Sequence, residues 1–144
     1  MANVTQFKKA IYTARVHATG GRDGGRAHSD DGRLDIKLSL PGGPGAGTNP
    51  EQLLAAGWAS CFTSAIKSLA AKKKVRLPSD MSIDAEVDLC QGDDGYSIQA
   101  RLNVSLPGLD HEVAQELADD AEQICPYSKA TRGNIGVSVN VVSS

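Results

Sequence analysis

The pattern of apolar and polar positions is dominated by one long stretch without charged residues, residues 53–66. Thr48 and Asn49, just before it, are residue types favoured at helix N-caps, and Pro50 suits the first helical position. The stretch predicts a core helix, because a membrane span needs about 20 apolar residues. Its apolar residues lie all around the axis, so a helix over residues 50–71 must be covered on every side.

Alternation of apolar and polar residues predicts strands on both sides of this helix. The expected strands span residues 12–19, 34–40, 81–89, 96–106 and 136–142. The third and fourth flank Gly92-Asp93-Asp94-Gly95, which predicts a β-hairpin with a four-residue turn. Residues 20–25 are a glycine-rich turn, and residues 41–47 form a flexible loop that leads into the helix.

A second, amphipathic helix is expected after Asp110, a candidate N-cap. Its apolar stripe ends at Cys125, and Pro126 stops or kinks the helix there. The order of strands, long helix, hairpin, helix and strand predicts an α+β fold with an antiparallel sheet. A chain of 144 residues is most simply one domain, residues 1–144.

Composition argues against several classes of function. The net charge of −2 gives no electrostatic basis for binding nucleic acid or an anionic membrane. No N-terminal segment joins a basic start to an apolar stretch, so we expect a cytoplasmic protein. The three histidines are scattered, and neither a CxxC nor an HExxH spacing occurs, so no metal site is expected.

The long helix also predicts assembly. A helix of about 22 residues is about 33 Å long, and the rest of the chain has little material to enclose it on every side. The residues near its middle are small, so a second backbone can approach closely: Ala55, Ala56, Gly57, Ala59 and Ser60. We therefore expect a homodimer that buries this helix at or near its interface.

The candidate chemistry lies in the thiols. Three cysteines, Cys61, Cys90 and Cys125, are too few and too odd in number for a disulfide scaffold. Cys61 lies too deep in the long helix for the helix N-terminus to lower its pKa, and burial would raise that pKa above the usual value of about 8.5. A reactive Cys61 therefore needs a nearby cation. Arg22, Arg132 and the lysines from Lys67 onward are all candidates.

Five segments carry a resemblance to a known family. They are ATGGRDG at 18–24, LDIKLS at 34–39, TNPEQL at 48–53, AAGWASCF at 55–62 and CPYSKATRGNI at 125–135. In this order they resemble the organic hydroperoxide resistance (Ohr) proteins of the OsmC-like superfamily. The CPYS-x-ATRGN form, together with the early TGGR, favours the Ohr branch over the OsmC branch.

The resemblance implies a thiol peroxidase with the OsmC-like fold, in an intertwined homodimer with two active sites at the subunit interface. Cys61 matches the peroxidatic cysteine, and Cys125 matches the resolving cysteine that closes a disulfide with it. Arg22 matches the arginine that stabilises the thiolate and polarises the peroxide, and Glu51 matches the glutamate that holds this arginine. The family reductant is dihydrolipoamide or a lipoylated protein, and the resemblance implies no flavin, haem or metal.

Spacing adds a further expectation about this set. Glu51 and Cys61 are ten residues apart, which is about 15 Å along a straight helix and about 80° around it. Arg22 can scarcely touch both within one subunit, so we expect Glu51 to come from the partner chain, and the origin of Arg22 stays open. An apolar pocket around Cys61 would favour alkyl or fatty-acid hydroperoxides over hydrogen peroxide.

The sequence departs from the family pattern in two places. Trp58 stands where the family commonly has tyrosine, and the loop 41–47 is a few residues shorter than in many members. Three other interpretations of the thiols stay open: a redox sensor or binding module on the same fold, a Cys–His hydrolase in which Cys61 is acylated, and a structural protein with inert thiols.

Overall fold

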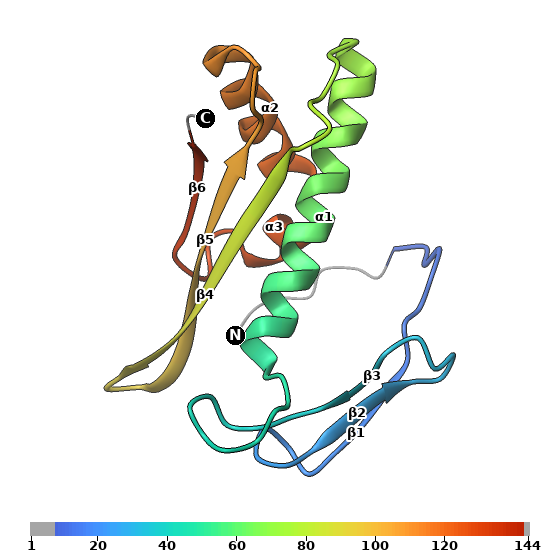
Figure 1. The fold of residues 1–144 in the computed structure, drawn as a ribbon, viewed down its shortest axis with the longest axis vertical. Coiled ribbons are helices and arrows are strands. Elements are labelled where there is room, and N and C mark those ends of the chain that lie inside the picture. Colours follow the sequence, from blue (N-terminus) through green and yellow to red (C-terminus); the bar gives the residue numbers. More distant parts are fainter. Residues whose placement is uncertain (1–7, 143–144) are drawn as a thin grey trace. The chain divides into compact units, whose positions relative to one another are not determined.

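The computed structural model describes residues 8–142, which divide into two compact units, one up to Asn49 and one from Pro50 onward. The first unit is a three-stranded antiparallel sheet in the order β1-β2-β3 (Figure 1). Its strands are β1 (Val16–Thr19), β2 (Arg26–Ser29) and β3 (Asp35–Lys37). The two strands expected here, at 12–19 and 34–40, are shorter than predicted, and all residues of β1 are exposed rather than half-buried.

β2 was not predicted. It is only four residues long, Arg-Ala-His-Ser, and of these only Ala27 is buried, so it shows no period in the sequence. The strand forms because the glycine-rich turn returns the chain alongside β1. Gly20, Gly21 and Gly24 all have positive φ, and a Cβ on Gly25 would collide with backbone oxygens of the same turn.

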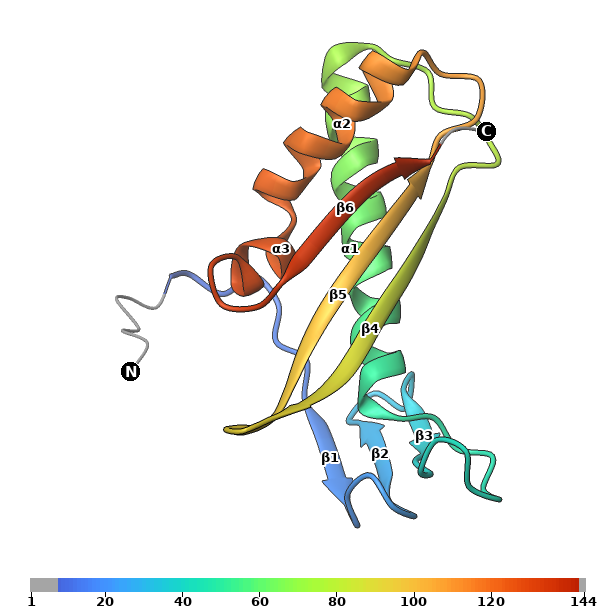
Figure 2. The same ribbon diagram turned by 90° about the vertical axis from the view of Figure 1, so that its left-hand side faces the viewer.

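The second unit contains the long helix α1 (Pro50–Lys73), the hairpin strands β4 (Ser82–Gly92) and β5 (Gly95–Ser105), and β6 (Val137–Val142). Two further helices, α2 (His111–Ile124) and α3 (Pro126–Thr131), lie between β5 and β6. Gly92 pairs with Gly95, so Asp93 and Asp94 alone form the hairpin loop. The helices α1 and α2 cover one face of the β4-β5-β6 sheet (Figure 2).

Alternation along β5 places its apolar side chains on the face of the sheet that the helices cover. Ala100, Leu102 and Val104 are buried beneath the helices, while Arg101 and Asn103 point to the opposite, polar face. The helices supply the other half of the core; its largest fully buried side chains there are Trp58, Phe62, Ile66 and Leu117. The α+β class expected from the sequence is confirmed.

Two details of this unit were not expected. β6 pairs parallel to β5, so the second sheet is mixed, because the chain returns to it through the α2–α3 crossover. Pro126 does stop α2, but it also occupies the first turn of α3, a helix that the sequence did not predict. Cys125 is thus both the C-cap of α2 and the N-cap of α3.

The covering of α1 is one-sided within a single chain. Its buried residues, Trp58, Phe62, Ala65, Ile66 and Ala70, face the sheet and α2, whereas Ala56, Ser60 and Ser64 are exposed. By length and composition α1 is also sufficient to cross a membrane, a criterion that core helices of soluble proteins meet as well. The described residues leave this face of α1 exposed.

Candidate active site

Two of the three thiols lie together in the second unit. The Cys125 thiol donates to the Cys61 sulfur across 3.4 Å, and both cysteines are free. Cys125 is fully buried, and Cys61 is half-buried where α1 packs on the apolar core. Cys90 is half-buried on β4, opposite Ser97 of the hairpin. Of the three thiols, Cys61 and Cys125 are thus the two that the structure brings into contact.

The break between α2 and α3 positions Cys125. Its backbone N–H still donates to Ala121 at 2.8 Å, while its carbonyl already accepts from Lys129 of α3 at 2.9 Å. Its own φ and ψ of −63° and 123° are extended, and this turns the chain between the two helices. Pro126 favours this backbone geometry at Cys125, because residues before proline prefer extended conformations.

A buried hydrogen bond joins the same two segments. The Trp58 indole N–H donates to the Ser128 hydroxyl at 3.1 Å, and both side chains are almost inaccessible. Trp58 lies three residues before Cys61, and Ser128 lies three residues after Cys125. The bond therefore clamps α3 against α1 one turn away from the thiols.

Tyr127 completes this contact. Its ring lies 6.4 Å from that of Trp58, centre to centre, and a Cβ built on Gly57 would come within 2.5 Å of the Tyr127 hydroxyl. Only glycine at position 57 leaves room for the ring beside α1. Nothing in the sequence indicated Ser128, Tyr127 or Gly57 as site-forming residues, although all three lie within segments that carry the family resemblance.

The electrostatics of Cys61 match the expectation from sequence. Burial is the main cause that raises the pKa of the Cys61 thiol, and the neighbouring Cys125 thiol raises it further. The backbone N–H of Tyr127 opposes both by lowering the pKa, but the net direction is upward. A thiolate at neutral pH therefore needs an additional positive charge.

The candidate cations are distributed between the two units. Arg132 donates to the backbone carbonyl of Glu122 at 2.6 Å, and Lys73 pairs with Glu116 and Asp120 at 2.9 and 2.6 Å. Both of these cations are thus engaged with α2. Arg22 is half-buried in the glycine-rich turn of the first unit, and Glu51 is half-buried in the first turn of α1. Their roles beside Cys61 stay predictions.

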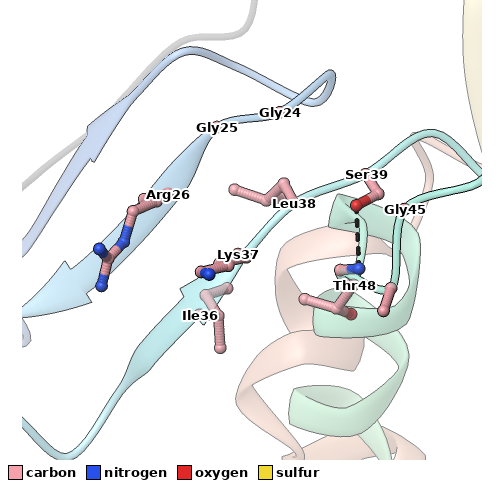
Figure 3. Close-up of a pocket in the computed structure, with 11 residues that line it drawn as sticks. Gly24, Gly25, Arg26, Ile36, Lys37, Leu38, Ser39, Gly45 and Thr48 are labelled. Atoms are coloured by element: carbon pink, nitrogen blue, oxygen red, sulfur yellow. Dashed lines mark hydrogen bonds between the residues drawn. The ribbon is translucent and has the colours of Figure 1, made fainter.

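Among the described residues, a cavity lies in each unit. The larger, about 730 Å³, is an open hollow of the first unit, lined by β2, β3 and the following loop (Figure 3). Arg26, Lys37, Ile36 and Leu38 contribute to its wall, and Ser39 accepts a hydrogen bond from the backbone N–H of Gly47 at 2.9 Å. The smaller, about 110 Å³, adjoins Trp58 and Ser128. Within residues 8–142 no group of three or more His, Cys, Asp or Glu side chains is placed to hold a metal ion.

Comparison with known proteins agrees with the fold and with the sequence motifs. The family described as "OsmC-like protein" matches residues 42–140. The "Organic hydroperoxide resistance protein" of Xanthomonas axonopodis pv. citri is 50% identical over 138 residues, which cover 93% of this chain and 96% of that one. The "Organic hydroperoxide resistance protein OhrB" of Bacillus subtilis is 42% identical over 135 residues, which cover 92% of this chain and 98% of that one.

Solved structures give the same result. The crystal structure of OhrB of Bacillus subtilis superposes with a TM-score of 0.86 at 42% identity, covering 92% of this chain and all of that one. A Vibrio cholerae structure, described as a putative organic hydroperoxide resistance protein with captopril bound in one of its active sites, has a TM-score of 0.86 at 38% identity, covering 94% of this chain and 95% of that one. The chain belongs to the OsmC-like family and, within it, to the organic hydroperoxide resistance proteins.

Proposed function

We propose that this protein detoxifies organic hydroperoxides as a cysteine-based peroxidase in the response to oxidative stress. The names of its relatives support the detoxifying role. The observation that supports the thiol mechanism is the 3.4 Å distance between the Cys125 and Cys61 sulfurs. At this distance the Cys125 thiol can react with a sulfenic acid formed on Cys61 without rearrangement of the fold.

In the first step the Cys61 thiolate attacks the terminal oxygen of ROOH. The O–O bond breaks, an S–O bond forms, and the alkoxide leaves and takes up a proton as the alcohol. Cys61 becomes a sulfenic acid, and the sulfur has been oxidised by two electrons. The Cys125 thiol then attacks this sulfur, so that a disulfide forms and water departs.

A dithiol closes the cycle. A lipoyl dithiol, as dihydrolipoamide or on a lipoylated protein, attacks the Cys61–Cys125 disulfide through a mixed disulfide and leaves as the cyclic lipoyl disulfide. Both protein thiols are restored, and the two electrons delivered to the peroxide have come from the dithiol. Such a cycle suits a reducing compartment, and we place the protein in the cytoplasm.

In this proposal Arg22 supplies the positive charge that the Cys61 thiolate needs, and Glu51 holds Arg22 in place. Burial raises the pKa of Cys61, so its thiolate must be stabilised by a fixed cation. Arg22 provides that cation and polarises the peroxide, while the Glu51 carboxylate orients the guanidinium. Apolar surroundings favour alkyl and fatty-acid hydroperoxides over hydrogen peroxide, since Cys61 packs against the hydrophobic core of the second unit.

The working form in this proposal is an intertwined homodimer. One face of α1, with Ala56, Ser60 and Ser64, is exposed in the single chain, and its small side chains permit close approach of another backbone. Analytical ultracentrifugation measures the mass directly. Mixing Cys61→Ser chains with Glu51→Ala chains then asks whether a site is shared: recovery of activity supports a site built across subunits, and no recovery supports a site built within one chain.

The decisive experiment is anaerobic stopped-flow oxidation of the reduced protein by cumene hydroperoxide, linoleic acid hydroperoxide and hydrogen peroxide in parallel, followed by turnover with dihydrolipoamide. Fast oxidation by the organic peroxides, absent in Cys61→Ser, supports the peroxidase, and Cys125→Ser is expected to stop at the sulfenic acid. The matched control is Cys90→Ser, which should retain both steps. Slow oxidation without preference would favour a sensing or structural role for the thiols.

A further inference from the structure

His17 and His28 lie directly opposite each other in the first unit. They form a register pair of the antiparallel strands β1 and β2, so their side chains leave the sheet on the same face. Their ring centres are 5.5 Å apart, with the ring planes tilted by 47°, and both residues are exposed. Two imidazoles at this separation on adjacent strands can reach a shared ligand.

The separation fits one metal ion between the rings. A first-row metal lies about 2.0–2.1 Å from each ligating nitrogen, which puts the centres of two imidazoles on a tetrahedral ion about 5 Å apart. The observed 5.5 Å is close to this value, so rotation about the side-chain torsions is enough to bring two nitrogens onto one ion. The backbone register need not change.

We propose that His17 and His28 form a two-imidazole site for a borderline divalent transition metal ion, of the class Zn²⁺, Ni²⁺ or Cu²⁺. Imidazole suits these ions, whereas Mg²⁺ and Ca²⁺ prefer oxygen ligands. Water fills the remaining positions. Asp35 pairs with His28 on its other side, but its carboxylate already accepts from Arg26 at 2.9 Å, so the protein contributes two ligands.

The histidine pair lies close to the glycine-rich turn that carries Arg22. The β1–β2 pairing ends two register pairs beyond the histidines, where Thr19 lies opposite Arg26. The turn that follows Thr19 carries Arg22. A metal ion bridging His17 and His28 ties β1 to β2 at the base of that turn. Metal binding is therefore coupled to the order of the segment that carries the proposed catalytic arginine.

The test is isothermal titration of untagged full-length protein with NiCl₂ and with ZnCl₂. All variants carry serine at positions 61, 90 and 125, so that thiols do not bind or reduce the metal and the outcome is independent of peroxidase activity. His17→Ala and His28→Gln should each weaken binding by about tenfold or more, since even outer-shell partners of a metal ligand are worth about 10–100-fold. The matched control is His111→Ala, which removes the third histidine, at the start of α2, and should leave the affinity unchanged.

A second measurement excludes loss of folding as the cause. The unfolding midpoint should rise with NiCl₂ concentration in the parent and in His111→Ala, and stay flat in His17→Ala and His28→Gln, since an ion that binds only the folded chain stabilises it. Circular dichroism without metal should be the same for all four. Equal affinity in His17→Ala and the parent, or an equal loss in His111→Ala, would overturn the proposal.

Discussion

The indole N–H of Trp58 donates to the hydroxyl of Ser128 across 70 residues of sequence, and this buried bond of 3.1 Å ties the helix of one thiol to the helix that follows the other. The bond contributes directly to the geometry of the thiol pair, because it holds α3 against α1 beside Cys61.

Removing the acceptor should loosen this junction. Ser128→Ala leaves the buried indole N–H without its partner, which costs about 1–3 kcal/mol of unfolding free energy. We also expect slower closure of the Cys61–Cys125 disulfide after a stoichiometric pulse of diamide, because Cys125 is held less firmly. Urea unfolding and mass spectrometry of alkylated samples measure the two effects. Ser138→Ala on the exposed side of β6 is the control and should change neither.

Gly57→Ala should destabilise the protein although it replaces a helix-interior glycine. In an open helix this change gains about 1 kcal/mol. Here the new methyl group would meet the Tyr127 ring, and overpacking of this kind costs about 1–3 kcal/mol. The double variant Gly57→Ala/Tyr127→Ala removes the obstacle, so alanine at 57 should then be stabilising relative to Tyr127→Ala alone. A cycle of four unfolding curves gives the sign in both backgrounds, and the same sign in both would contradict the packing argument.

The sequence predicted the long elements best. α2 and the β4–β5 hairpin repeat their period over many residues, and α1 is marked by a long run without charged residues after N-cap residue types. Their positions therefore agree with the structure to within about one turn or a few residues at each end. β2 and α3 have only four and six residues, too few to show a period. The turns beside β2 and the proline at the start of α3 favour a loop at these places. The parallel direction of β6 was not predictable either, since it depends on a partner strand more than thirty residues away.

For the site, the residues alone left three thiols with several roles open, and only the resemblance suggested the pair Cys61 and Cys125. The structure brings these two together through packing of α1 on the α2–α3 junction, a contact over 64 residues that no local pattern encodes. The hydrogen bond of Trp58 to Ser128 is equally non-local. Periodicity shows which face of a helix is buried, but not which side chain from another element meets it.

The C-terminus of α1 offers a stabilising change. Lys74 has φ of +56°, and the N–H groups of Lys74 and Val75 donate to Ala71 and Ala70, as in a Schellman cap. A left-handed conformation costs a residue with a side chain about 1–2 kcal/mol, and glycine avoids this cost. Lys74→Gly should therefore raise the unfolding midpoint. Lys72→Gly, two residues earlier and still helical, should lower it, because glycine costs about 1 kcal/mol in a helix interior.

Acid stability should depend on Asp88. Arg101 donates to both Asp88 oxygens at 2.8 Å, and Gln99 donates to one of them at 2.8 Å. These bonds hold the pKa of the Asp88 carboxyl well below its usual range. The stabilisation is thus complete above the unfolded pKa of about 3.9 and is lost as pH falls below it toward the depressed folded value. Asp88→Asn should lower the urea midpoint at pH 7 and flatten its decline below pH 4. Asp84→Asn, on the same strand, is the matched control and should keep the parental slope.

The alkaline behaviour of Cys61 tests the need for Arg22. Burial and the neighbouring Cys125 thiol raise the pKa of Cys61, so in Arg22→Ala the rate of alkylation by iodoacetamide should titrate above the ordinary value of about 8.5. With Arg22 present the titration should lie lower, because the guanidinium favours the thiolate. In the variant, the folded state holds the Cys61 proton more tightly than the unfolded state. Stability is therefore full below the unfolded pKa and declines as pH rises toward the raised folded pKa. Mass spectrometry of the Cys61 peptide across pH 6–10 gives the titration, with Arg33→Ala as the control for a general loss of positive charge. Coincident titrations in Arg22→Ala and the parent would remove Arg22 from the site.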